Sequence, residues 1–169
     1  MLRDDRTGNG ETVGDADLDR LVEVALPAVR AIVAVAVRSL DASPVAVTVA
    51  QYRVLVTMAQ QGPTRAATLA TVLGVDASTL TRMCDRLVRD GLVVRRGERT
   101  DRRAVRVALS PTGKDVVDRV MARRREEFCA LLERIPAERR AGVVAALQEI
   151  DAATRSTTVV PSAVLGWIA

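Results

Sequence analysis

The segment 77–91 carries hydroxyl and guanidinium groups at a spacing suited to hydrogen bonding with a partner. At 100° per helical residue, one side of the segment is apolar, formed by Leu80, Met83, Cys84 and Leu87. The opposite side is polar, formed by Ser78, Arg82, Asp85 and Arg89. Hydroxyls and arginines in the first turns of a helix can contact base edges in the major groove of DNA.

These side chains divide into two candidate groups along the helix. Those near its start are candidate base contacts, and they are Ser78, Thr79 and Arg82. Those further along are candidate phosphate contacts, and they are Arg86 and Arg89. A polar face that meets only solvent would have the same pattern, so this helix alone does not decide between the two interpretations.

A second group of arginines lies between two short β-prone runs, 92–94 and 105–109. The connecting stretch, 95–104, is polar and rich in arginine, which predicts a hairpin with an exposed tip. Residues 62–106 contain ten arginines and five acidic residues, a local charge of +5, whereas the whole chain has a net charge of +4. Such local clustering of positive charge is expected of a surface that binds a polyanion.

Three helices are predicted to position these groups, over 49–60, 66–73 and 77–91. Gly62 and Pro63 end the first, with Val54, Leu55 and Met58 facing inward. Gly74 breaks the second, and Asp76 is predicted to cap the third with its carboxylate. The order is therefore helix, tight turn, helix.

Longer helices are predicted on either side of this region. The first covers 16–40, where Pro27 should kink the helix or mark its true start, and where 33–37 could instead be a strand. Ser110 and Pro111 begin a helix to about residue 135, and Pro136 opens another to about 153. Residues 1–15 are predicted to be a disordered arm, and the apolar tail 156–169 has no assignment.

The outer helices have more apolar side chains than one small domain can cover. Residues 31–37 are apolar on every side, and the later helices add Val116, Val117, Val120, Met121, Phe128, Leu131, Leu132, Ile135, Val143, Val144, Leu147 and Ile150. We therefore expect helices 16–40 and 111–153 to form a dimer interface. The alternative is that they complete the core of a monomer.

The hairpin carries a motif that resembles the MarR (multiple antibiotic resistance regulator) family. The family has Asp-x-Arg, five residues, then Leu-Thr, and this chain has Asp101, Arg103, Leu109 and Ser110 at those positions. Only the final Thr is changed, to Ser. Further similar pieces occur in order at Gln51 to Leu55, Leu69-Ala-x-x-Leu-Gly74, Ser78 to Arg82, Asp85 to Leu87 and Gly91-Leu-Val, so the resemblance covers about residues 16–153.

The resemblance implies a mainly α fold with a small β-wing. It is a winged helix-turn-helix domain over 16–155, with a DNA-binding part at 49–110 and N- and C-terminal dimerisation helices. In the wing, Arg103 would enter the minor groove, Arg99 and Arg102 would contact phosphates, and Asp101 would stabilise the hairpin through hydrogen bonds.

The function implied is that of a sequence-specific transcriptional regulator that binds double-stranded DNA. The resemblance implies a cytoplasmic, ligand-responsive repressor that binds an inverted-repeat operator as a homodimer, with a small lipophilic or aromatic effector in a crevice between the dimer helices and the winged domain. The alternative is a winged-helix module that binds another protein without specific DNA binding.

Several other functions are disfavoured by composition. The chain has no histidine, which removes the commonest general base and the commonest zinc ligand, so we expect neither an enzyme nor a metal site, and no cofactor. Cys84 and Cys129 are expected to be small buried hydrophobic residues rather than redox sensors. No signal peptide opens the sequence, and charges interrupt its most apolar segment, so no membrane association is expected.

Overall fold

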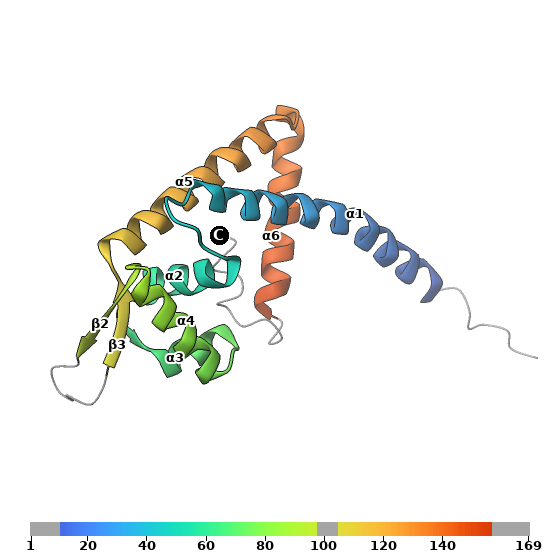
Figure 1. Cartoon of the computed structure of the whole chain (residues 1–169). Coiled ribbons are helices and arrows are strands. Elements are labelled where there is room, and N and C mark those ends of the chain that lie inside the picture. The colour runs from blue at the N-terminus through green and yellow to red at the C-terminus, as the bar shows by residue number, and fades with distance from the viewer. Residues whose placement is uncertain (1–10, 98–104, 157–169) are drawn as a thin grey trace, which may run out of the picture. The chain divides into compact units, whose positions relative to one another are not determined.

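The computed structural model describes residues 11–97 and 105–156. It divides into two compact units, Met1–Val35 and Ala36–Ala169. The second unit combines α-helices with a three-stranded sheet (Figure 1). The elements in chain order are α1 (Glu11–Arg38), η1 (Ser39–Ala42), α2 (Val49–Gln61), β1 (Thr64–Arg65), α3 (Ala66–Leu73), α4 (Ala77–Arg89), β2 (Val93–Gly97), β3 (Val105–Leu109), α5 (Pro111–Glu133) and α6 (Ala137–Ser156). The predicted class, mainly α with a small β-wing, is confirmed.

Helix α1 confirms the predicted helix over most of its length, but it starts earlier than predicted. It begins at Glu11, inside the predicted arm, and it continues through Pro27, which is therefore not its start. Residues 33–37 are helical rather than extended. Ala25 and Leu26 before Pro27 and Ala28 after it favour helix, which is consistent with the helix continuing past the proline. The remainder of the predicted arm, residues 1–10, and the tail from 157 lie outside the described residues.

Helix α2 is capped at its start and buried along its length. Thr48 and Gln51 form a reciprocal capping box: the Gln51 amide donates to Thr48 Oγ1 at 3.2 Å, and the Thr48 amide donates to Gln51 Oε1 at 2.8 Å. Its buried residues are Gln51, Tyr52, Val54, Leu55, Val56, Thr57 and Met58. The helix ends where Gly62 adopts a φ of 72°, a conformation that favours glycine.

A tight turn joins α3 to α4. Gly74 takes the left-handed conformation, and Val75 donates to the Ala70 carbonyl at 3.0 Å, which closes the end of α3. Asp76 stands at the N-cap of α4, but its side chain makes no capping hydrogen bond, so the predicted carboxylate cap is wrong. The carboxylate is exposed and can be hydrated instead, while the Asp76 carbonyl accepts from Leu80 at 2.9 Å.

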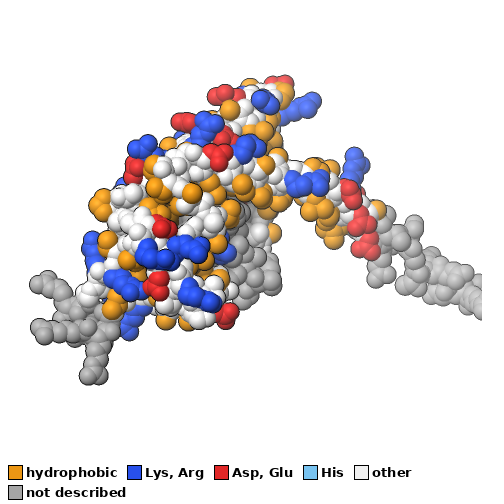
Figure 2. Space-filling model, viewed as in Figure 1, with side chains coloured by type: hydrophobic (Ala, Val, Ile, Leu, Met, Phe, Trp, Pro, Cys, Tyr) orange, Lys and Arg blue, Asp and Glu red, His pale blue; other side chains and the backbone are white. Residues whose placement is uncertain are grey.

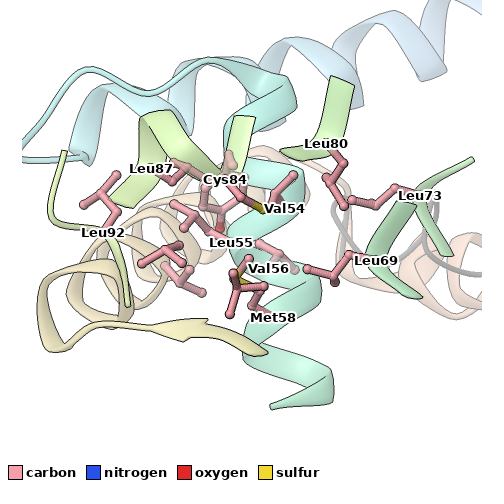
Figure 3. Packing of buried hydrophobic residues seen from close by; sticks show 14 of the residues in the cluster. Val54, Leu55, Val56, Met58, Leu69, Leu73, Leu80, Cys84, Leu87 and Leu92 are labelled. Atoms are coloured by element: carbon pink, nitrogen blue, oxygen red, sulfur yellow. The ribbon is translucent and has the colours of Figure 1, made fainter. Parts of the chain in front are cut away.

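The core of the second unit is assembled around α2. Figure 3 shows Val54, Leu55 and other side chains of α2 against those of α3, α4 and Leu92. The fully buried large side chains include Tyr52, Leu55, Met58, Leu69, Leu80, Leu87, Leu92, Val116 and Val120. Helices α2 to α5 and the sheet therefore share one apolar cluster.

The sheet has the strand order β1-β3-β2, and both pairs are antiparallel. Strand β2 extends to Gly97, three residues beyond its prediction, because Gly97 pairs with Val105. Strand β1 was not predicted, since two residues are too short to show an alternating pattern.

The cysteines occupy different environments. Cys84 lies in the core, and burial, helped by the nearby charge of Asp85 and opposed by Arg95, raises the pKa of its thiol. Cys129 is exposed, so the expectation of a buried residue is wrong for it. It lies in the C-terminal half of α5, past the buried Arg124, where most side chains of the chain meet solvent.

The described helices include none with the length and apolar content needed to cross a membrane. Within the same residues, cysteine and acidic side chains form no cluster of three that could hold a metal ion.

The start of α5 is joined by hydrogen bonds to the turn that follows α4. The Ser110 hydroxyl accepts from the Gly113 amide at 2.9 Å and donates to the Gly91 carbonyl at 2.6 Å, as expected of the predicted N-cap. The Ser110 amide donates to the Leu92 carbonyl at 3.0 Å. A Cβ atom on Gly113 would lie 2.0 Å from that same carbonyl oxygen, so only glycine allows this close approach.

We expect Gly113→Ala to lower the free energy of unfolding by about 1–3 kcal/mol, because the backbone of Leu92 must move to admit the methyl group. Gly142→Ala is the matched control, since a Cβ atom there meets nothing within 4 Å, and it should raise the free energy of unfolding by up to about 1 kcal/mol. Urea unfolding of both variants at equal protein concentration measures the difference. Equal stabilities of the two variants would contradict the close approach.

Candidate nucleic-acid interface

Helix α4 presents two opposite faces. Leu80, Cys84 and Leu87 are buried against the core. The predicted site residues of this helix are all exposed, and they are Ser78, Thr79, Arg82, Arg86 and Arg89. Because the buried face cannot turn outward, the polar face is held toward solvent, and it stands free for a partner.

The exposed face of α4 borders a surface hollow of about 460 Å³. One side of the hollow is formed by the start of α2, with Thr48 and Gln51. The other side is formed by α4, with Thr79, Arg82, Met83, Asp85, Arg86 and Arg89. The N-terminus of α2 adds a partial positive charge to the positive charge of the arginines. Sequence reasoning missed the involvement of α2, although the spacing of Thr48 and Gln51 is the signature of a helix start.

An ion pair joins α4 to the sheet. Asp85 of α4 accepts a hydrogen bond from Arg95 Nη2 of β2, and both side chains are about half exposed. The sequence placed Asp85 on the same face as the arginines without identifying this partner. The contact explains why an acidic residue can occupy a basic face, since its charge is balanced by the neighbouring strand.

The hairpin of β2 and β3 carries further arginines toward its tip. Arg95 and Arg96 are exposed on β2, and Arg106 of β3 donates to the Pro63 carbonyl at 3.3 Å. The strands remain paired as far as Gly97 and Val105. The predicted wing residues Arg99, Asp101, Arg102 and Arg103 lie outside the described residues, so their roles stay predictions.

Positive charge is concentrated where these elements meet. Figure 2 shows Lys and Arg side chains gathered over the region of α4, with few acidic side chains between them. Arginines from α4 and β2 contribute to this surface, namely Arg82, Arg86, Arg89 and Arg95. The arrangement can bind an extended polyanion through guanidinium forks and hydroxyls.

Comparison with known proteins agrees with this architecture. A family model described as "MarR family" matches residues 47–105, from the approach to α2 as far as the start of β3. The multiple antibiotic resistance protein MarR of Salmonella typhimurium is 36% identical over 81 residues, which is 48% of this chain. The match spans only 56% of that relative's own length.

Two solved structures extend the similarity beyond this segment. RV1404 from Mycobacterium tuberculosis is 37% identical with a TM-score of 0.75, over 83% of this chain and 94% of that one. Wild-type MarR from E. coli is 28% identical with a TM-score of 0.59, over 79% of this chain and 96% of that one. The matched segment, the similar proteins and the winged fold agree, and this chain belongs to the MarR family.

Proposed function

We propose that the chain is a sequence-specific transcriptional regulator that binds double-stranded DNA. The observation that carries the proposal is the exposed face of α4, where hydroxyls and arginines project from a helix whose other face is fixed in the core. Thirteen helical residues are about 20 Å long, which suits insertion into a major groove. Ser78, Thr79 and Arg82 contact base edges, while Arg86 and Arg89 contact phosphates.

The wing makes the second contact with DNA in this proposal. The residues between the paired strands β2 and β3, 98–104, include Arg99, Arg102 and Arg103. Arg103 enters the narrow minor groove, where its charge attracts it without reading much sequence. Asp101 stabilises the wing, and Arg99 and Arg102 contact phosphates.

The proposed regulator acts as a homodimer. In the first unit, large apolar side chains of α1 are exposed, namely Leu18, Leu21, Val22, Val24, Leu26, Val29 and Val33. In the second unit, α6 exposes Val144, Leu147 and Ile150. Apolar surface of this extent supports the proposal of an interface between subunits. A symmetric dimer places two copies of α4 about 34–36 Å apart, which selects an inverted-repeat operator.

Binding at such an operator represses transcription in this proposal, and a small lipophilic or aromatic effector releases the protein. No metal or cofactor takes part.

Arg82→Ala should weaken binding to a duplex selected from random sequence by about 1–3 kcal/mol more than binding to random DNA, because a base-reading arginine carries discrimination. Arg125→Ala, an exposed arginine of α5, is the control and should leave this difference unchanged. Fluorescence titration of the wild-type protein and both variants with each of the two duplexes gives the six affinities. If the wild-type chain selects no sequence yet captures a partner protein, the winged-helix interaction module is the better explanation.

Arg103→Ala should weaken binding to selected and random duplexes alike. The fall of log affinity with log salt should become shallower by about one unit of slope, because about one counterion fewer is released. Asp101→Ala should keep that slope close to the wild-type value, because it removes no positive charge. Titrations at several salt concentrations distinguish the two variants. Wild-type affinity and slope for Arg103→Ala would mean that the wing does not touch DNA.

Light scattering should give twice the chain mass of 18.2 kDa at micromolar protein concentration. Leu21→Glu and Ile150→Glu should shift the protein toward monomer, since each places a charge on an exposed apolar face. Glu149→Lys alters a neighbouring exposed charge of α6 and should preserve the dimer. A wild-type monomer would overturn the homodimer.

A further inference from the structure

A buried arginine, Arg124, links the end of α1 to helix α5 through hydrogen bonds. Arg124 of α5 is 2% exposed. Its Nε donates to the Ser39 hydroxyl at 3.2 Å, and its Nη2 donates to the Ala36 carbonyl at 3.3 Å. Ser39 also donates to the Ala36 carbonyl, at 2.7 Å. Arg124 therefore joins the last turn of α1 and the first residue of η1 to the middle of α5.

The same guanidinium group reaches a third element. Its central carbon lies 5.3 Å from the centre of the Tyr52 ring, which belongs to α2 and is fully buried in the core. The Tyr52 hydroxyl is buried without a hydrogen-bond partner in the part of the chain that the structure describes. The ring face, rather than the hydroxyl, is thus what Tyr52 offers to Arg124.

An arginine is a costly choice for this position if packing is the sole requirement. Burial disfavours the charged form and lowers the pKa of Arg124, although the neighbouring Tyr52 opposes this effect. A methionine or leucine would fill similar space without that cost. What arginine adds is a rigid planar fork, which fixes the direction of each hydrogen bond and of the ring contact.

The outer side of the same junction is held differently. Glu127 accepts from Arg38 at 3.2 Å and from Arg123 at 3.0 Å, and both arginines are more than half exposed. The Glu127 side chain is 15% exposed, but water reaches both arginines and weakens these ion pairs. Arg124 is shielded from water, so its contacts hold the end of α1 against α2 and α5 more firmly than these pairs do.

We propose that Arg124 is a positioning residue. It sets the orientation of the end of α1 relative to α2 and to the apolar cluster on which α4 packs. In a dimer, this orientation determines the distance between the two α4 helices. This inference rests on the proposed function. It predicts that loss of the fork relaxes the preference for one half-site spacing rather than the reading of bases.

The test uses the full chain with a duplex that the wild-type protein has selected, and with versions that gain or lose one or two base pairs between the half-sites. Arg124→Met removes the fork, Arg124→Lys keeps the charge, and Tyr52→Leu removes the ring face. Tyr52→Phe and Glu127→Gln are the matched controls. Arg124→Met should reduce the ratio of affinities for correct and altered spacing by about tenfold, whereas both controls should keep the wild-type ratio.

A second measurement does not involve DNA. A spin label at Thr71→Cys, in a Cys129→Ser background, reports the distance between the two subunits, because Thr71 is exposed on α3 and Cys84 is buried. Arg124→Met should broaden or shift this distance distribution, and Glu127→Gln should not. If Arg124→Met fails to fold, Arg124→Lys and Tyr52→Leu give the decisive values.

The inference is overturned if these variants keep the wild-type spacing ratio and distance distribution. It is also overturned if they lose affinity equally at every spacing, since that result is a loss of stability alone. Failure of the proposed function is recognised separately, because the wild-type protein would then select no duplex.

Discussion

The burial of helix α2 is the constraint on which the second unit depends. From Gln51 to Met58, every residue except Arg53 is buried, so the helix must be covered on nearly all sides. Core residues of α3, α4, α5 and the sheet provide this cover in one cluster. Because Leu80, Cys84 and Leu87 of α4 are buried in this cluster, the arginines on the opposite side of that helix face outward. The basic surface is thus a consequence of core packing.

Electrostatics refine this arrangement without creating it. The pair between Asp85 and Arg95 is exposed, and such pairs add little to stability in water. Its effect is geometric, since it connects the middle of α4 to the start of the hairpin. Helix and wing are therefore oriented together, while the net charge of the surface stays positive.

Much of the fold could be predicted because its signals are local. These signals are Gly74, the Ser110 cap and the helical spacing of apolar residues in α4. Each depends on residues a few positions apart in the chain, and all appear in the structure. Strand β1 and the contact of Arg124 with Tyr52 could not be predicted, because they join residues distant in sequence. The missing side-chain cap at Asp76 and the exposure of Cys129 depend on which surfaces are covered, which a single sequence does not record.

The two ends of α4 are held unequally. At its C-terminal end, Asp90 donates to the Arg86 carbonyl and Leu92 to the Leu87 carbonyl, and Leu92 is itself bonded to Ser110. Local opening there requires several bonds to break at once, so its amides should exchange slowly with solvent. The N-terminal end, with Ser78 and Thr79, has no side-chain cap and frays more readily. The helix is therefore anchored at one end and adaptable at the other, and the adaptable end can adjust its fit to each partner.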